Sequence, residues 1–298
     1  METADYKLLL TCPSGLLPSQ LSVVFDRSYD RIPHPNAELE DSIGQIWEDR
    51  VQGNSSLFNG KKYRYGGYSL RDGGEAKGVS HPCLHLGSTD YRTFVGTNLN
   101  PLWENFLALS EVVFTVDDVI KCQHTASPLG NGAIVVTADN EIVVLRRSDN
   151  VGEFPGHFVF PGGHPEPDEV VLATSQNGQD FVSIEELHKK ISEEIFDSIA
   201  REVVEEIGVP ATSLSTPVFI GLSRRILNVR PAAFFYMKCN LPSKEVHQLY
   251  SSALDGYESI QLHTVSPVVL EHMKSKMPGC HQGGFALYKL MIQASTNA

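Results

Sequence analysis

Residues 201–209, Arg-Glu-Val-Val-Glu-Glu-Ile-Gly-Val, constrain this chain more than any other segment. On a helix, Glu202, Glu205 and Glu206 stand at i, i+3 and i+4, so their carboxylates share one face. Gly208 is typical of a helix C-terminus. Like charges this close repel unless a cation lies among them, and hard oxygen ligands favour Mg²⁺ or Mn²⁺. The pattern indicates a carboxylate metal site, although a solvated acidic helix face has the same spacing. The apolar face comprises Ile199, Ala200, Val203, Val204 and Ile207.

A glycine pair lies upstream, in the run Phe-Pro-Gly-Gly-His-Pro-Glu-Pro of residues 160–167. Gly162 and Gly163 follow an apolar, β-like stretch, where glycine lets the backbone approach a ligand closely. Together the two segments resemble the Nudix box, whose pattern is G-x5-E-x7-R-E-U-x-E-E-x-G-U, with U an aliphatic residue. The resemblance implies that the three glutamates hold the metal, that one of them also acts as a base, and that Arg201 braces the loop and a glutamate. The matches are Arg201, Glu202, Val203, Glu205, Glu206, Gly208 and Val209.

The N-terminal half of the box departs from this pattern. Glu193 has the required spacing to Arg201, but it lies far downstream of Gly163, whereas Glu169 has the required spacing to Gly163 but not to Arg201. A segment of residues 168–192 is therefore inserted inside the box. It contains turn-forming residues and, at 183–186, the capping-box pattern Ser-Ile-Glu-Glu. We expect the insert to form a loop or short helix at the rim of the site and to leave the helix of the three glutamates unbroken.

Composition and charge narrow the class of protein. The 298 residues can bury one large core or two modest ones. The net charge of −12 argues against a nucleic-acid partner, because polyphosphate backbones need a basic surface. We expect no membrane association, since no long apolar run is present, and no secretory signal. The scattered cysteines predict free thiols in a cytoplasmic protein, and they are Cys12, Cys83, Cys122, Cys239 and Cys280.

Turn-forming residues at 125–132 divide the chain into two regions. We predict an α+β domain or extension at 1–125 and a Nudix domain at 126–298. Strands flanked by helices on both sides predict an α/β fold, a three-layer α/β/α sandwich with a mixed sheet. The expected strands of the second region are 133–137, 142–145, 158–160, 217–222, 232–239 and 259–265, with a last helix through 285–291. The first region shows apolar segments at 7–11, 21–25, 63–65 and 83–86 and an amphipathic helix at 41–51.

Beyond the box, the chain resembles one small branch of the Nudix family over nearly its full length. The branch includes animal UDP-glucose/UDP-galactose diphosphatases, which also carry an enlarged box. The resemblance implies Mg²⁺-dependent cleavage of a nucleoside diphosphate linked to another moiety. For a UDP-hexose, the products are UMP and the hexose 1-phosphate. The segments that carry this wider resemblance are 8–13, 89–98, 128–130, 145–148 and 161–167.

Two other functions stay open at this stage. One is a broader diphosphatase acting on another nucleotide, such as ADP-ribose, NADH or CoA. The animal relatives have an imperfect box end, whereas this chain keeps Arg201 and Gly208, so its substrate can differ from theirs. The other is a non-catalytic module that binds a nucleotide and regulates a partner. The complete glutamate set weighs against a sensor, which has no need for three metal ligands.

Arginines near a predicted strand are candidates for substrate phosphate. Arg224, Arg225 and Arg230 suit bidentate phosphate binding, although ordinary surface charge explains them equally well. His164 lies beside the glycine pair, where a loop histidine is more often structural than catalytic. Glu258 is a candidate base from a late loop.

The segment shared with the UDP-sugar enzymes contains candidates for nucleoside recognition. Tyr91 suits stacking on a base, and Thr97 and Asn98 suit hydrogen bonding to it. A well-packed loop between the two regions is the alternative. We expect the N-terminal region to cover one side of the site and to contact the nucleoside or sugar.

Overall fold

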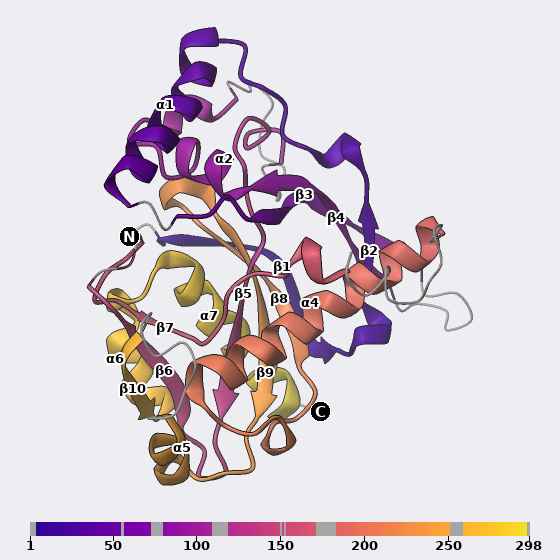
Figure 1. Cartoon of the computed structure of the whole chain (residues 1–298). Coiled ribbons are helices and arrows are strands. Elements are labelled where there is room, and N and C mark those ends of the chain that lie inside the picture. The colour runs from indigo at the N-terminus through magenta and orange to yellow at the C-terminus, as the bar shows by residue number, and fades with distance from the viewer. Residues whose placement is uncertain are drawn as a thin grey trace.

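The strands form one large and one small sheet, and the helices lie around them (Figure 1). The computed structural model describes residues 4–54, 57–72, 80–108, 119–149, 151, 153–170, 183–250 and 259–296. Glu258 and residues 171–182 of the expected insert lie outside these ranges. The strands are β1 (Tyr6–Leu16), β2 (Ser22–Phe25), β3 (Lys61–Asp72), β4 (Ser80–Asp90), β5 (Gly130–Val136), β6 (Ile142–Arg147), β7 (Phe158–Val159), β8 (Val218–Arg225), β9 (Pro231–Lys238) and β10 (Ser259–Val265).

The helices vary widely in length. The α-helices are α1 (Ala37–Gly53), α2 (Tyr91–Gly96), α4 (Ile184–Ile207), α5 (Ser243–Tyr250), α6 (Pro267–Met273) and α7 (Gly279–Thr296). The short 3-10 helices are η1 (Pro18–Gln20), η2 (Arg27–Tyr29), η3 (Trp103–Phe106), η4 (Ala211–Ser213), η5 (Leu227–Val229) and η6 (Lys274–Lys276). The expected strands and the two expected helices are all present, with their ends displaced by a few residues at most places.

The large sheet is mixed, as the sequence predicts. Its seven strands run in the order β1-β8-β9-β5-β6-β10, and β7 pairs with β6 beside this path. β5 and β9 are parallel, whereas β1, β8 and β9 form antiparallel pairs in turn. The small sheet has the order β2-β4-β3. The expected N-terminal unit of residues 1–125 is thus divided between the sheets, because β1 belongs to the large one.

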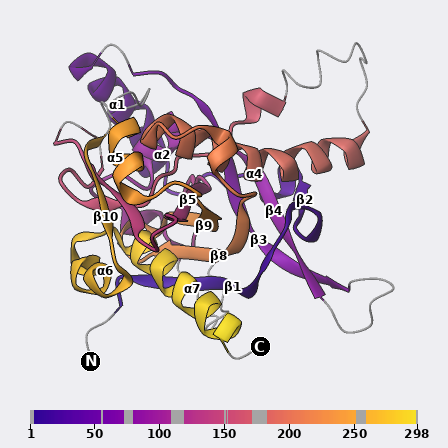
Figure 2. The same cartoon turned by 90° about the horizontal axis from the view of Figure 1, so that it is seen from below.

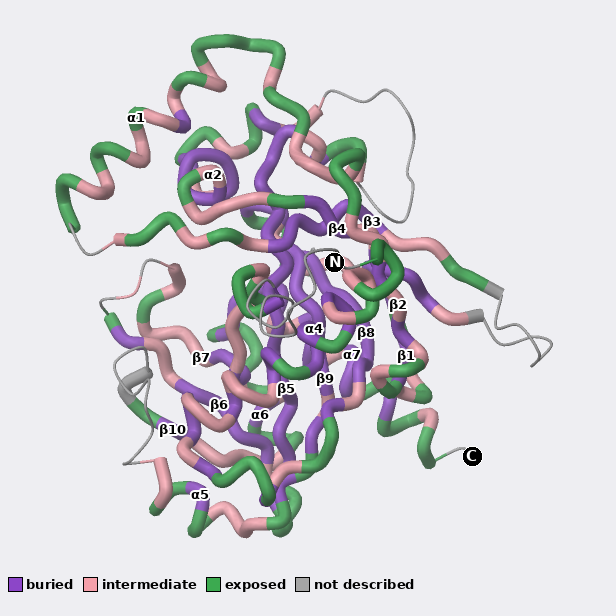
Figure 3. The backbone as a smooth tube through the Cα atoms, turned by 45° about the vertical axis from the view of Figure 1, so that its right-hand side comes forward, coloured by how far each residue is buried: buried purple, intermediate pink, exposed green. Residues whose placement is uncertain are grey.

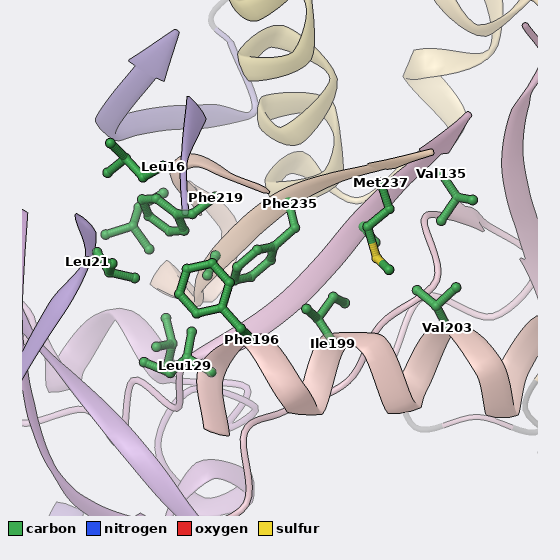
Figure 4. Close-up of a cluster of buried hydrophobic side chains, with 14 of the residues drawn as sticks. Leu16, Leu21, Leu129, Val135, Phe196, Ile199, Val203, Phe219, Phe235 and Met237 are labelled. Atoms are coloured by element: carbon green, nitrogen blue, oxygen red, sulfur yellow. The ribbon is translucent and has the colours of Figure 1, made fainter. Parts of the chain in front are cut away.

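Long helices cover opposite faces of the large sheet (Figure 2). Alternation along β5 explains why both faces are apolar: Ala133 and Val135 belong to one buried cluster, and Ile134 and Val136 to the other. On the first face, Phe196, Ile199 and Val203 of α4 point toward Phe235, Met237 and Val135 (Figure 4). On the second face, α7 contributes Phe285, Leu287, Tyr288 and Met291. The three-layer α/β/α arrangement is confirmed.

Helix α4 also joins the two sheets. Its Ser192 Oγ donates to the carbonyl of Leu21 at 2.8 Å, and His188 Nε2 lies 3.2 Å from the carbonyl of Phe25. The buried cluster beneath α4 continues into the small sheet through Tyr65 and Leu84. The strands at the centre of the molecule are buried, whereas the residues of α1 at its edge are mostly exposed or intermediate (Figure 3).

The end of the insert is part of α4 itself. Ser183 caps the helix and accepts from the backbone N–H of Glu186, so the capping-box residues start this helix and not a separate short one. The helix then runs unbroken to Ile207 and ends at Gly208, whose φ of 74° lies in the left-handed region that glycine tolerates. The helix of the three glutamates is therefore intact, and the insert lengthens it at its N-terminus.

The cysteines are free thiols, as the sequence predicts. All five are buried. Within the described part of the chain, no helix combines the length and apolar character that a membrane crossing requires.

Candidate functional site

A cleft of about 580 Å³ lies between α4, the glycine-containing segment and the N-terminal region. This volume is in the range of small-molecule sites, about 300–1,000 Å³. The cleft brings together residues that are far apart in the sequence. Its lining includes Lys62, Tyr91, Phe94, Gly130, Asn131, Arg147, Glu153, Phe160, Gly162, Gly163, His164, Glu166, Glu202, Glu205, Glu206, Arg230, Ala232, Cys280 and His281.

The three glutamates of α4 form one wall of the cleft. Glu206 is buried, and Glu202 and Glu205 are partly exposed. The backbone N–H of Gly162 donates to Glu206 Oε2 at 2.7 Å, and that of His164 donates to Glu202 Oε1 at 3.3 Å. Two of the three carboxylates are thus held against the segment that carries the glycine pair.

The glycine pair is needed because neighbouring atoms leave no room for a side chain. Gly162 has a φ of 155°, and a Cβ on it would overlap the carbonyl oxygen of Asn131. A Cβ on Gly163 would overlap the carboxylate of Glu202. The N–H of Gly163 donates to Asn131 Oδ1 at 2.7 Å, which fixes the segment to β5. The pair therefore lets backbone lie directly between β5 and the carboxylates of α4.

Arg201 lies outside the cleft lining and pairs with Glu194. Its Nη2 donates to Glu194 Oε1 at 2.7 Å, and the same oxygen accepts from the backbone N–H of Glu166 at 3.0 Å. Glu194 is buried, whereas Glu193 is half exposed and lies 3.7 Å from Lys189 Nζ. Arg201 thus braces a buried carboxylate that in turn holds the loop.

The arginines expected to bind phosphate have different positions. Arg230 lines the cleft, and Arg230 Nη1 donates to Glu153 Oε2 at 2.6 Å. Arg225 is buried and also pairs with Glu153. Arg224 is buried with its guanidinium over the Tyr65 ring, and it is not among the described residues that line the cleft. Burial opposes ionisation of Glu153, but the charges of Arg225 and Arg230 outweigh it and hold its pKa below the usual range.

A strained turn leads into Arg230. Asn228 and Val229 have φ values of 52° and 49°, a left-handed conformation that is unusual for asparagine and unfavourable for a β-branched residue. Asn98 Nδ2 donates to the carbonyl of Asn228 at 2.7 Å, and Arg225 Nε donates to its Oδ1 at 2.5 Å. These bonds hold the turn that places Arg230 beside Glu153 and the cleft.

Thr97 and Asn98 are therefore not brought to the cleft as substrate contacts. Both are fully buried at the end of α2. Thr97 Oγ1 accepts from the N–H of Ala126, and Asn98 Oδ1 accepts from the N–H of Ser127, each at 3.0 Å. Their polar groups are used inside the protein because the loop that follows the N-terminal region is itself buried and needs partners. Tyr91 does line the cleft, next to Phe94.

Two cleft histidines are held in the neutral form. Burial, together with the charges of Arg230 and Lys62, keeps the pKa of His164 well below its usual range. Its Nε2 lies 2.7 Å from Arg230 Nη2, and a neutral ring accepts there from the guanidinium. Burial and the neighbouring arginines lower the pKa of His281 to about 3. His281 Nδ1 accepts from the N–H of Phe160 at 3.1 Å.

Over 297 residues the chain is 62% identical to Nudix hydrolase 9 of Arabidopsis thaliana, an alignment that covers 99% of this chain and 94% of that protein. The chain belongs to the Nudix hydrolase family. It is also 32% identical to the uridine diphosphate glucose pyrophosphatase NUDT22 of Homo sapiens, over 99% of this chain and 95% of the relative. No protein-family model matches the chain. Among solved structures, the MutT protein from Methanosarcina mazei Go1 is 21% identical, with a TM-score of 0.33 over 54% of this chain and 91% of that chain.

Several residues of this Nudix site were missed by the sequence prediction. Glu194 was missed because the spacing of the box pattern pointed to Glu193. On one continuous helix, residues seven apart lie within about 20° of each other, so Glu194 and not Glu193 faces Arg201. Lys62, Glu153 and His281 were missed because each comes from a remote element. No local motif marks these three.

The residues of the cleft fit a divalent cation, which Nudix hydrolases generally use. Glu202, Glu205 and Glu206 supply hard carboxylate oxygens from one helix face, and the glycine pair lets backbone lie directly beside them. In the described parts of the chain, no three His, Cys, Asp or Glu side chains are already grouped closely enough to hold a metal ion. Two of the carboxylates instead accept backbone hydrogen bonds from the loop. The three glutamates are thus suitable ligands in chemistry and position, but they do not form a complete coordination shell.

Proposed function

We propose that this Nudix hydrolase cleaves the diphosphate of a UDP-sugar, such as UDP-glucose or UDP-galactose, into UMP and the sugar 1-phosphate, with Mg²⁺ or Mn²⁺ as cofactor. One observation carries the proposal. The N-terminal region forms a second part of the cleft lining, through Lys62, Tyr91 and Phe94. The alignment with the human UDP-glucose pyrophosphatase spans 99% of this chain and therefore includes this second wall.

The second wall suits a nucleotide sugar for chemical reasons. Lys62 is a cation of the cleft, and its own pairing with Glu166 is loose, at 3.7 Å. Such a contact is readily exchanged for a phosphate oxygen. Tyr91 has its ring edge-on to Trp47, with centroids 6.0 Å apart, so the ring is supported by packing. A supported aromatic ring is a suitable surface for a base to stack on.

The glutamates are proposed to hold the divalent cation and to accept the proton of the attacking water. Water adds to one phosphorus, the bond from that phosphorus to the bridging oxygen breaks, and the other phosphate leaves with that oxygen. A bound divalent cation supplies charge neutralisation at the phosphoryl oxygens and lowers the pKa of water. Glu202, Glu205 or Glu206 takes the proton. Gly162 and Gly163 let backbone lie beside the carboxylates, and Arg201 holds the loop through Glu194.

A substrate panel with Mg²⁺ tests this function. We expect UDP-glucose and UDP-galactose to be turned over faster than ADP-ribose, NADH and CoA derivatives, with UMP and the sugar 1-phosphate as products. Faster turnover of ADP-ribose, NADH or a CoA derivative would show that the site has the broader diphosphatase activity and not the proposed preference for UDP-sugars. Binding without turnover of any nucleotide in the panel would support a sensing module and contradict the proposal.

The bond that breaks can be followed with ¹⁸O-water. Attack at phosphorus places the label in a phosphate group of UMP or of the sugar 1-phosphate, where ³¹P NMR resolves it by an isotope shift. Label on free sugar, with UDP as the other product, would show attack at the sugar carbon. That outcome would replace phosphoryl chemistry by glycosyl hydrolysis.

A further inference from the structure

His281 is a cleft residue that the three-glutamate chemistry does not use. It lies in the first turns of α7, on the face of the large sheet opposite α4, and it reaches the cleft from there. Its ring packs edge-on to Phe234, with centroids 5.6 Å apart, and tilted against Phe160 at 5.9 Å. The ring is therefore held between two buried aromatic side chains while part of it stays exposed to the cleft.

One hydrogen bond fixes which ring nitrogen of His281 carries the proton. Nδ1 accepts from the backbone N–H of Phe160 at 3.1 Å, so it carries a lone pair. In a neutral imidazole the other nitrogen is then the donor. The neutral form is favoured chiefly because burial penalises the charged ring, and the charges of Arg147, Arg230 and Arg225 add to this effect and outweigh Glu153. His281 Nε2–H is thus a fixed, uncharged donor.

The surroundings of His281 indicate what such a donor would meet. Arg147 and Arg230 line the same cleft, and Arg147 Nε donates to the carbonyl of Glu153 at 2.9 Å, which holds its guanidinium at the wall. The floor beside the ring is made of small residues, because Gly130 pairs with Ala232 across β5 and β9. A Cβ on the nearby Gly132 would lie 2.9 Å from Phe234 Cε1 and 3.8 Å from His281 Cε1, so Gly132 lets the two rings pack closely. The cleft beside the ring is lined by Arg147, Arg230 and the neutral donor of His281, groups that suit an anion.

We propose that His281 donates its Nε2–H to a phosphoryl oxygen of the substrate diphosphate and is a substrate-binding residue of this cleft. The inference rests on the proposed function, since it names a contact to the same substrate. His281 holds its proton throughout and transfers none. Its second contact, with the N–H of Phe160, positions the start of the segment that leads to Gly162 and Gly163.

Two substitutions separate the substrate contact from the structural one. His281→Asn keeps an acceptor at the place of Nδ1 but is too short to reach into the cleft. His281→Gln places an amide N–H near the position of Nε2 but loses the acceptor for Phe160. We expect His281→Asn to lower kcat/KM for UDP-glucose about 10- to 100-fold, the effect of a hydrogen bond to a charged group. We expect His281→Gln to stay within about fivefold of the parent. The reverse order would show that His281 acts only through Phe160 and would overturn the proposal.

NMR of the full chain with ¹⁵N-labelled histidine gives a readout independent of turnover. We expect His281 to show the neutral Nε2–H tautomer from pH 5 to pH 8. Its Nε2 signal should shift on addition of UDP and not on addition of uridine, which lacks the phosphates. A shift with uridine would indicate that His281 contacts the nucleoside, and the absence of a shift with UDP would indicate that it contacts neither part. Either result overturns the proposal. Turnover of UDP-sugars by the parent protein tests the proposed function separately, whatever the His281 variants do.

Discussion

The two walls of the cleft are built in different ways. The α4 wall presents three carboxylates from one helix, and backbone N–H groups of the adjoining loop hold two of them. The N-terminal wall presents Lys62, Tyr91 and Phe94 from two different elements. One wall follows from a local spacing in the sequence, and the other follows from tertiary packing. In the proposed function, the first wall carries the chemistry and the second carries the recognition of the substrate.

Removal of one carboxylate is expected to have the largest effect, and it tests whether the α4 wall carries the chemistry. We expect Glu206→Gln to lower kcat a hundredfold or more, because a ligand charge is lost from the α4 wall. The fold should persist, since the amide oxygen can still accept from Gly162. Circular dichroism and steady-state turnover with Mg²⁺ measure the two effects.

Glu193→Gln is the matched control on the same helix. Glu193 has the spacing of a box residue but is half exposed and lies beside Lys189. We expect its kcat to stay at the parent value. A folded Glu206→Gln protein with near-normal turnover, or a Glu193→Gln protein with a hundredfold loss, would mean that the carboxylates are misassigned.

The contact between the N-terminal wall and the turn before Arg230 is tested at Asn98. Asn98→Ala leaves the N–H of Ser127 and the carbonyl of Asn228 without this partner. We expect the free energy of unfolding to fall by about 3 kcal/mol, because two buried polar groups lose a hydrogen bond. Urea denaturation measures it, with the exposed Asn105→Ala as a control that should change by less than about 0.5 kcal/mol. Equal stability of the two variants would show that the strained turn is held without Asn98.

His281 makes one contribution to stability depend on pH. A histidine with a folded pKa of about 3 and an unfolded pKa of 6.5 binds protons more readily when the chain is unfolded. Its contribution is therefore complete above pH 6.5 and is lost as the pH falls toward 3. Between pH 7 and pH 5 we expect a loss of about 2 kcal/mol. His281→Asn should lack this part of the pH dependence, and identical slopes for parent and variant would contradict the neutral, buried histidine.

The proposed role of the N-terminal wall in recognition is tested at Tyr91. We expect Tyr91→Ala to raise KM about tenfold, because stacking of a base on an aromatic ring is worth about 1–3 kcal/mol. Turnover at saturation should change less, since the α4 wall is untouched. Tyr91→Phe keeps the ring and should retain the parent KM. An unchanged KM in Tyr91→Ala would leave the N-terminal wall as scaffolding only.

The sequence predicted features whose causes are local. The helix periodicity around Glu202, the left-handed Gly208 and the tight approach at Gly163 each follow from a few neighbouring residues. The polar residues of α2 were harder to interpret. Thr97 and Asn98 resemble ligand contacts in sequence, yet buried backbone groups of residues 126–127 take their hydrogen bonds. Buried backbone N–H groups need hydrogen-bond acceptors, and this need arises only in the folded chain. It favours a structural role for Thr97 and Asn98 over a ligand contact.

The ionic contacts that line the cleft also could not be predicted from the sequence alone. Arg230 was expected to meet phosphate directly, but Glu153 and His164 already engage its guanidinium. Nothing near Arg230 in the sequence indicates that Glu153, from a loop between two strands, reaches it. A buried arginine needs such partners, and only the tertiary fold supplies them.

The position of β1 has a consequence for biosynthesis. Tyr6 pairs with Arg225, so β1 is made long before its partner strand β8. During translation β1 emerges early and stays an unpaired edge until β8 has left the ribosome. Non-local strand pairing is slow, and unpaired edges are prone to aggregation while they wait. His281 emerges later still, so a ribosome-bound chain with every other cleft residue in place would lack the donor from α7.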